Sequence, residues 1–223
     1  MSVSGVILAA GSGTRFGGPE AKAWTHLAGR PLLWHAIDAF ARSGCVDELV
    51  VVVRSQDKTR VASLPPVGVP VHAVVGGERR ADSSLAGISA SQGEVVLVHD
   101  GARPLVTPDL ILRTLEAARR HGAAVPVLPL SDTVRYADAH FLKNSIVDRF
   151  GLVLVQTPQG FSRPVLVHAY AEASRQGLDL PDDAAAMLAV GHPVATVPGD
   201  PTNLKITRPE DLLLAERMLA LAR

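Results

Sequence analysis

A glycine-rich loop with two cationic side chains lies near the start of the chain. The segment LAAGSGTRFGG, residues 8–18, follows an apolar run. Its glycines are Gly11, Gly13, Gly17 and Gly18. Small residues let backbone N–H groups approach a polyphosphate, and Arg15 and Lys22 could neutralise charge that builds up on a transferring phosphoryl group. The loop therefore predicts a polyphosphate site, and the alternative is a flexible glycine turn with solvated cations.

The glycine spacing separates this loop from two other phosphate motifs. No Gly-Lys-Ser or Gly-Lys-Thr follows it, so it is not a P-loop. The pattern is G-x-G-x-x-x-G rather than G-x-G-x-x-G. The apolar run ELVVVVRS also lacks the acidic residue that a dinucleotide site places at the end of its second strand. A dehydrogenase is therefore disfavoured.

A carboxylate follows a predicted central strand in VLVHDGARPLV, residues 96–106. Open α/β sheets bind ligands at the carboxyl ends of their strands. A lone Asp100 beside polyphosphate suits Mg²⁺, which prefers oxygen ligands and keeps several waters; the alternative is an aspartate that caps a turn. We predict a structural role for His99, and we expect Arg103 to hold the loop by pairing with a carboxylate.

A third segment, GGERRADSSLAG at residues 76–87, follows a predicted strand and opens a helix. Its glycine backbone and the hydroxyl of Ser83 or Ser84 could read the edge of a base. The alternative is a helix start capped by Asp82, with two solvated arginines beside it.

Two cations downstream are candidates for binding a phosphate. Arg149, in IVDRF, is placed where a dimer could send it into a neighbouring active site. Lys205, in TNLKITRPEDL, just precedes a final predicted helix with a capping box from Thr207 to Glu210. Either cation could instead be solvated or paired with a nearby acid.

The elements that must position these residues alternate along the chain. Strands are predicted at 3–8, 48–53, 71–75, 94–99, 123–128 and 193–198, and helices at 31–43, 57–63, 82–91, 108–120, 164–176, 183–190 and 207–222. Most of the strands are apolar on both faces, as strands covered by helices on both sides must be. This alternation predicts an α/β fold with a doubly wound, mostly parallel sheet.

Residues 131–156 break this rhythm, with short alternating runs, charge and few helix signals. We predict a projecting two-stranded arm or hairpin. Its apolar residues are Phe141, Leu142, Ile146 and Val147. They need a partner surface, because a lone hairpin is only marginally stable, and a homodimer would supply it. The chain, residues 1–223, otherwise fits a single domain with this arm as an appendage.

The composition limits which binding partners and which cellular compartment we expect. The 22 basic and 22 acidic residues cancel, which argues against a general nucleic-acid or membrane-surface binder but allows a local basic pocket. Cys45 is the only cysteine, so no intrachain disulfide or multi-cysteine metal site can form, and we expect it to be a packing residue. No apolar run approaches the ~20 residues of a spanning helix. We expect a cytoplasmic protein without nucleic-acid or membrane partners.

The ordered set of motifs resembles the 2-C-methyl-D-erythritol 4-phosphate cytidylyltransferases of the non-mevalonate isoprenoid pathway. The matching segments are LAAGSGTRF, Lys22, GGERRADS, VHDGARP, LSDTVR, QTPQGF and NLKITRPEDL, which together extend over nearly the whole chain. The resemblance implies a Rossmann-like α/β domain whose arm builds a homodimer. It also implies Mg²⁺ as cofactor, and CTP and a small sugar-alcohol phosphate as substrates. The substrate phosphate attacks the α-phosphorus of CTP in line, without a covalent enzyme intermediate.

The resemblance also assigns roles to residues of this sequence. Arg15 and Lys22 match the residues that stabilise the pentacoordinate transition state. Arg149, contributed by a partner subunit, and Lys205 match those that place the methylerythritol phosphate, and Asp100 matches an aspartate near the metal and the substrate hydroxyls. The other assigned residues are Thr157 for this substrate, and Ala9, Ala10, Gly11, Gly13, Gly77, Glu78 and Ser83 for cytidine and triphosphate.

The sequence departs from the family pattern at three places and leaves two other functions open. Ala23 follows Lys22 where Pro-Lys-Gln is usual, Pro181 stands where a threonine is common, and Thr202 stands where some relatives carry an aspartate, so no second metal ligand is assigned. One alternative is a ribitol 5-phosphate cytidylyltransferase, which shares the fold and CTP; HDGARP and QTPQGF favour methylerythritol phosphate. The other is a non-catalytic nucleotide-binding module. Arg15 and Lys22 argue against it, because a binder needs no transition-state cations.

Overall fold

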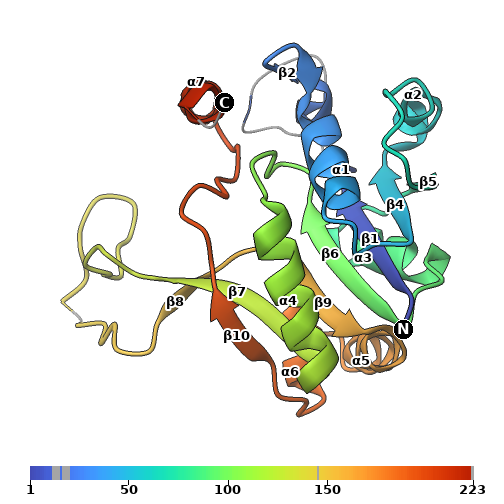
Figure 1. Cartoon of the computed structure of the whole chain (residues 1–223). Helices are drawn as coiled ribbons and strands as arrows, with labels where there is room; N and C mark the ends of the chain where they lie inside the picture. The colour runs from blue at the N-terminus through green and yellow to red at the C-terminus, as the bar shows by residue number, and fades with distance from the viewer. Residues whose placement is uncertain (12–15, 17–20, 145, 222–223) are drawn as a thin grey trace.

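The computed structural model describes residues 1–11, 16, 21–144 and 146–221, and its centre is a mixed eight-stranded sheet (Figure 1). The strand order is β10-β7-β9-β6-β1-β4-β5, and β8 pairs with β7 outside this path. The strands are β1 (Val3–Leu8), β4 (Glu48–Val53), β5 (Val71–Val75), β6 (Val95–Asp100), β7 (Ala123–Pro129), β8 (Val153–Val155), β9 (Gln159–Ser162) and β10 (Ala195–Pro198). A separate short pair joins β2 (His26–Leu27) and β3 (Arg30–Pro31).

Helices cover both faces of the sheet, as predicted. They are α1 (Leu32–Arg42), α2 (Lys58–Val61), α3 (Arg80–Ala90), α4 (Pro108–His121), α5 (Arg163–Arg175), α6 (Asp183–Ala189) and α7 (Pro209–Leu221), with short 3₁₀ turns η2 (Lys22–Trp24) and η3 (Ser55–Asp57). The core contacts place α1 and α4 on one face, and α3, α5 and α6 on the other. Within the described residues, none of these helices has the length and apolar character needed to cross a bilayer.

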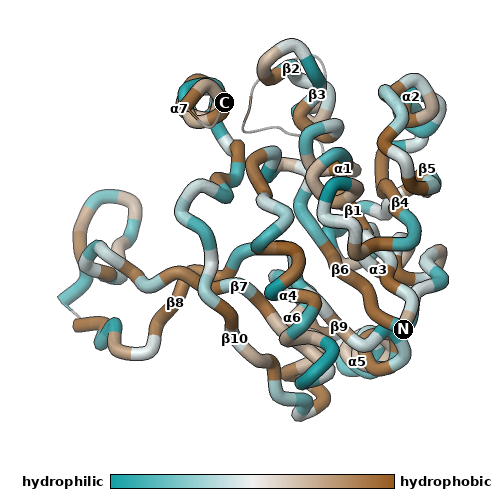
Figure 2. The backbone as a smooth tube through the Cα atoms, in the orientation of Figure 1, coloured by the Kyte–Doolittle hydropathy of each residue, from teal (hydrophilic) through white to brown (hydrophobic). Residues whose placement is uncertain are grey.

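Strand β4 is apolar from Leu49 to Val53 because helices cover both of its faces. Leu49 and Val51 belong to the cluster that contains Phe40 of α1, whereas Val50 and Val52 belong to the cluster of α3, α5 and α6. Successive side chains point to opposite faces of a strand, so a strand covered on both sides must be apolar at every position. Figure 2 shows the same hydrophobic character in the first part of β6, on the other side of β1, before the strand ends in the polar His99 and Asp100.

One strand of the main sheet was not predicted, and neither was the short pair of β2 and β3. β9 runs antiparallel between β6 and β7, which makes the sheet mixed at this point. Its sequence, QGFS, has no β-branched run, so its pairing is decided by packing. A Cβ at Gly160 would lie 2.8 Å from the Cβ of Ala118 and 3.0 Å from Cδ2 of Leu97. This glycine therefore lets α4 lie directly on the strand.

The arm is only partly the hairpin that was predicted. Its stem is an antiparallel pair, in which Val127 of β7 lies opposite Val155 of β8. The described residues beyond the stem form a loop with one isolated bridge, between Ala137 and Leu142, rather than two continuous strands. The arm projects from the sheet (Figures 1 and 2), and Phe150 at its base is 93% exposed. Phe141, Leu142 and Ile146 of the arm are also exposed, and no described part of the chain packs over these side chains.

The parallel register brings the candidate motifs to one edge of the sheet. Leu8 of β1 lies opposite Val52 of β4 on one side and Asp100 of β6 on the other. The carboxyl ends of β1, β4, β5 and β6 therefore meet at one edge, and the loops that follow β1, β5 and β6 gather there. In open α/β sheets this edge is where ligands bind.

Candidate active site

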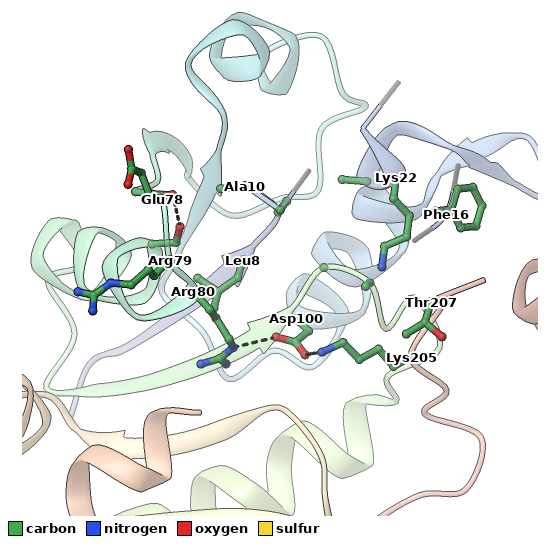
Figure 3. Close-up of a pocket in the computed structure, with 17 residues that line it drawn as sticks. Leu8, Ala10, Phe16, Lys22, Glu78, Arg79, Arg80, Asp100, Lys205 and Thr207 are labelled. Carbon is green, nitrogen blue, oxygen red and sulfur yellow. Dashed lines mark hydrogen bonds and ion pairs between the residues drawn. The ribbon is translucent and has the colours of Figure 1, made fainter. Parts of the chain in front are cut away.

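A cleft of about 340 Å³ opens at this edge. Its walls come from the segments after β1, β5 and β6, from η2, and from the segment before α7 (Figure 3). The predicted site residues that line it are Ala9, Ala10, Gly11, Lys22, Gly77, Glu78, Ser83, Asp100 and Lys205. Residues distant in sequence are thus brought together around one cavity.

Asp100 forms ion pairs with two cations of the cleft. Its Oδ2 lies 2.7 Å from Nζ of Lys205, and its Oδ1 lies 3.6 Å from Nε of Arg80 (Figure 3). Burial alone would raise the pKa of Asp100, but the positive charges of Lys205 and Arg80 outweigh that effect and hold the pKa well below its usual range. The residue is therefore a carboxylate at neutral pH.

Lys22 reaches the same region from the opposite wall. It begins the 3₁₀ turn η2, and its Nζ donates a 2.6 Å hydrogen bond to the carbonyl oxygen of Ile206. The turn is anchored by the buried side chain of Trp24. The guanidinium carbon of Arg60 lies over the Trp24 ring, 4.2 Å from its centroid. Ala23 is also buried. The small and aromatic residues after Lys22 thus fix the backbone from which its ammonium enters the cleft.

The glycines after β5 allow two loops to touch. A Cβ at Gly76 would lie 2.6 Å from both the Cβ of Ala10 and Oγ of Ser83, and a Cβ at Gly77 would lie 2.4 Å from the Cβ of Asp82. Ser83 donates a hydrogen bond to the Gly77 carbonyl oxygen. The N-terminal turn of α3 is stabilised as well, since Asp82 accepts a hydrogen bond from the backbone N–H of Arg79. Asp82 therefore helps to cap the start of α3, as one interpretation of this segment expected, whereas the reading of a base edge by Ser83 or Ser84 stays a prediction.

Thr157 lies behind the cleft and holds Asp100 in place. It is 4% exposed, and its Oγ1 accepts a 3.1 Å hydrogen bond from the backbone N–H of Asp100. The same oxygen lies 3.0 Å from Nδ1 of His99. Asn203 donates from Nδ2 to the Thr157 carbonyl oxygen. This placement favours positioning of the carboxylate over a direct substrate contact.

His99 and Arg103 hold the loop after β6. His99 is fully buried, and burial lowers its pKa to about 4, so the predicted structural role is confirmed. The prediction for Arg103 was wrong in its partner, because Nη1 donates to the carbonyl oxygen of Asn203 at 2.7 Å rather than to a carboxylate. Ile206 donates its N–H to the carbonyl oxygen of Ala102. The segment that carries Lys205 is thereby fixed against the loop after Asp100.

Three more assigned residues are not among those that line the described cleft. Arg15 and Gly13 lie outside the described residues, so their roles stay predictions. Arg149 belongs to the arm, is exposed, and donates a hydrogen bond to the carbonyl oxygen of Ser131. It does not line the cleft of its own chain.

Arg80 is the main residue that the sequence analysis missed. The alternative interpretation of its segment expected two solvated arginines, but Arg79 pairs with Asp82 at 2.8 Å and Arg80 is largely buried. The Arg80 side chain is 27% exposed, and its Nη2 lies 2.7 Å from Oδ2 of the fully buried Asp183. A usable signal was present, since Arg80 lies three and four residues before Ser83 and Ser84 and so faces the same side of α3. Other cleft residues that were not assigned are Leu8, Phe16, Ala23, Arg79, Gly101, Ala102 and Thr207.

The final helix begins with a related but different cap from the one predicted. Asp211, rather than Glu210, accepts hydrogen bonds from the backbone N–H and hydroxyl of Thr207. The backbone N–H of Arg208 donates to the same oxygen. This cap fixes the turn in which Thr207 reaches the cleft.

Asp100 has the chemistry that a divalent cation requires. It is ionised, it borders the cleft, and its Oδ1 has Arg80 only at 3.6 Å, beyond hydrogen-bond distance. Within the described residues no group of three or more His, Cys, Asp or Glu side chains could form an all-protein metal cage. The donor set fits Mg²⁺ held by one carboxylate together with phosphate oxygens and water.

Comparison with known proteins finds similar chains among cytidylyltransferases. The family model IspD, 2-C-methyl-D-erythritol 4-phosphate cytidylyltransferase, matches residues 3–221. A curated protein of that name from Thermus thermophilus is 43% identical over 224 residues, covering 100% of this chain and 98% of its own length. The crystal structure of the enzyme from Thermus thermophilus is similar with a TM-score of 0.83 and 40% identity, and 99% of this chain and 100% of that chain are covered.

Some relatives are longer than this chain. The bifunctional enzyme IspD/IspF of Anaeromyxobacter sp. strain Fw109-5 is 43% identical over 222 residues, which cover 97% of this chain but 57% of the relative. The chain thus spans little more than half the length of the bifunctional relatives that it matches.

The ion pair of Asp100 makes a testable prediction. Replacing Lys205 with Met should raise the pKa of Asp100, because the positive charge that lowers it most is lost while burial remains. Because the pKa of Asp100 is lower in the folded than in the unfolded protein, where it is about 3.9, its ionised form stabilises the fold above that pH. This contribution to stability is lost as the pH falls through the folded-state pKa. In the variant that pKa is higher, so the loss of stability should begin at a higher pH. A ¹³C titration of the Asp100 carboxyl measures the shift.

The control for this titration is Lys58→Met, which removes an exposed lysine on α2 and should leave the titration unchanged. An Asp100 pKa that is equally low in Lys205→Met and in the unsubstituted protein would contradict the ion pair.

Proposed function

The chain belongs to the 2-C-methyl-D-erythritol 4-phosphate cytidylyltransferase family, and we propose that it catalyses that reaction. CTP and 2-C-methyl-D-erythritol 4-phosphate give 4-diphosphocytidyl-2-C-methyl-D-erythritol and pyrophosphate, a step of non-mevalonate isoprenoid precursor biosynthesis. The observation that carries the proposal is the cleft, in which Lys22, Asp100 and Lys205 meet at the carboxyl edge of the sheet. The chain acts here as one nucleotidyltransferase domain over residues 1–223.

The nucleotide is proposed to lie on the wall made by the loops after β1 and β5. Ala9, Ala10, Gly11 and Gly13 would approach the triphosphate through the backbone, and Gly77, Glu78 and Ser83 would contact the cytidine. Support comes from the close approach of Gly76 to Ala10, which leaves no room for side chains between the two loops. Ser83 is among the residues that line the cleft, and its hydroxyl could read a base edge.

The transfer step needs charge neutralisation and positioning rather than a nucleophile on the protein. An oxygen of the substrate phosphate attacks the α-phosphorus in line, the new oxygen–phosphorus bond forms, and the bond to pyrophosphate breaks. Arg15 and Lys22 are proposed to stabilise the negative charge of the transition state. Cys45 is not needed, and burial raises the pKa of its thiol, which makes it a poor nucleophile.

Asp100 and Lys205 are proposed to bind the second substrate and the metal. In the structure they neutralise each other at 2.7 Å. On binding, Lys205 would turn to the phosphate of methylerythritol phosphate, and Asp100 would hold Mg²⁺ and the substrate hydroxyls, with Thr157 keeping the Asp100 backbone in place. Mg²⁺, when bound, supplies positive charge to the triphosphate.

The substrate site is proposed to be shared across a homodimer. Arg149 lies on an arm whose apolar residues are exposed, among them Phe141 and Ile146. A second copy of the chain would cover them and receive Arg149 next to its own Lys205. We propose a cytoplasmic location and no nucleic-acid or membrane partner, in keeping with a net charge of zero.

The reaction is tested by a two-substrate pyrophosphate assay. With Mg²⁺ and CTP, pyrophosphate should be released only when 2-C-methyl-D-erythritol 4-phosphate is added, and Lys22→Ala should lower kcat by about 10²–10³. Turnover of ribitol 5-phosphate in its place would contradict the substrate, and CTP binding without turnover of either alcohol phosphate would contradict the enzyme.

The shared site is tested by mixing two inactive variants. A heterodimer of Arg149→Ala and Lys22→Ala chains holds one site with both residues intact, so its activity should approach half that of the unsubstituted dimer. The matched control pairs Lys22→Ala with Lys205→Ala, because both residues lie in the cleft of one chain and every site stays defective. Equal inactivity of the two purified heterodimers would contradict a contribution of Arg149 in trans.

A further inference from the structure

A fully buried carboxylate lies behind the cleft and is not used by the transfer step. Asp183, at the start of α6, is 0% exposed. Its Oδ1 accepts hydrogen bonds from Oη of Tyr170, at 2.6 Å, and from Oγ of Ser84. Its Oδ2 accepts from Nη2 of Arg80 at 2.7 Å. Both oxygens therefore have specific partners, and one of them is a cation that lines the cleft.

Arg80 joins this buried group to the cleft. The guanidinium lies between two carboxylates, with Nη2 on Asp183 at 2.7 Å and Nε at 3.6 Å from Oδ1 of Asp100. Lys205 lies on the other oxygen of Asp100. Charges of alternating sign thus run from the core to the cleft in the order Asp183, Arg80, Asp100, Lys205, and Figure 3 shows the last three.

We propose that Asp183 is a positioning residue of the transferase site: it holds the guanidinium of Arg80 at a distance that supports the charge of Asp100 without a hydrogen bond to it. The inference rests on the proposed function, because it concerns the same cleft. Arg80 is near enough to favour the ionised form of Asp100, and Asp183 binds the guanidinium at the shorter distance. Oδ1 of Asp100 therefore stays open to a ligand.

Loss of the Asp183 charge would release this restraint. A guanidinium prefers a close, charge-assisted hydrogen bond to a carboxylate, and Asp100 is the neighbouring carboxylate within 3.6 Å. Arg80 would then close onto Oδ1 of Asp100 while Lys205 occupies Oδ2. Both oxygens would be engaged, and the site would bind its ligands less well without any change in its lining residues.

A purely structural role for Asp183 makes a different prediction. Asp183 also joins α6 to α3 and α5, because its Oδ1 accepts hydrogen bonds from Ser84 of α3 and Tyr170 of α5. Its backbone N–H donates to Oε1 of Gln159. If these contacts only stabilise the fold, a variant loses folded enzyme, which lowers the apparent kcat and leaves KM unchanged. A positioning role instead raises KM, and does so only when Arg80 is present.

The test is a double-mutant cycle with Asp183→Asn and Arg80→Gln, measured by pyrophosphate release at matched folded concentration. Asp183→Asn keeps the side-chain shape and should raise KM for CTP, lowering kcat/KM by about 10- to 100-fold, the usual effect of losing a group that holds a binding carboxylate. In the Arg80→Gln background, the same substitution should change kcat/KM by less than threefold. The double variant also removes both buried charges, which favours its folding.

The matched control is Tyr170→Phe, which removes one hydrogen bond to Asp183 but leaves its charge and its contact with Arg80. It should lower the unfolding temperature and change KM less than threefold. Equal losses from Asp183→Asn with and without Arg80, or a fall in kcat at constant KM, would overturn the inference. An unsubstituted protein that turns over no alcohol phosphate would contradict the proposed function instead.

Discussion

The candidate site depends on one carboxylate that stays ionised while nearly buried. Asp100 ends a central strand whose side chains are buried on both faces, where an isolated charge is costly. Lys205 at 2.7 Å and Arg80 at 3.6 Å offset this cost, and Arg80 is held in turn by Asp183. The surrounding loops bring these groups together, and removal of a partner would leave a largely buried charge without its counter-charge.

The topology supplies this meeting point, and short-range packing refines it. Parallel pairing of β1 with β4 and β6 brings three loops to one edge. Gly76 and Gly77 let the loop after β5 lie against Ala10 and Asp82. On the opposite wall, Trp24 and Arg60 fix the turn that carries Lys22. The cleft is thus built from backbone contacts on one side and from charged side chains on the other.

The sequence predicted much of this arrangement, for identifiable reasons. The apolar runs at 3–8 and 48–53 coincide with β1 and β4, because strands covered on both faces have a strong local pattern, and the run at 71–75 coincides with the edge strand β5. Antiparallel β9 was missed, since QGFS carries no such pattern and pairs through the space that Gly160 leaves. The spacing of Arg80 to Ser83 and Ser84 indicated which side of α3 it faces, but its partners Asp100 and Asp183 are distant in sequence, and only the folded chain brings them together.

A crystal structure of the chain with CTP and Mg²⁺ tests the central claim most directly. The account predicts a triphosphate beside Lys22, with the cytidine against Gly77 and Ser83. It also predicts an oxygen of Asp100 on the metal, with Arg80 still paired to Asp183. A nucleotide bound away from this edge of the sheet, or an Asp100 whose oxygens contact only Lys205 and Arg80 in the complex, would contradict it.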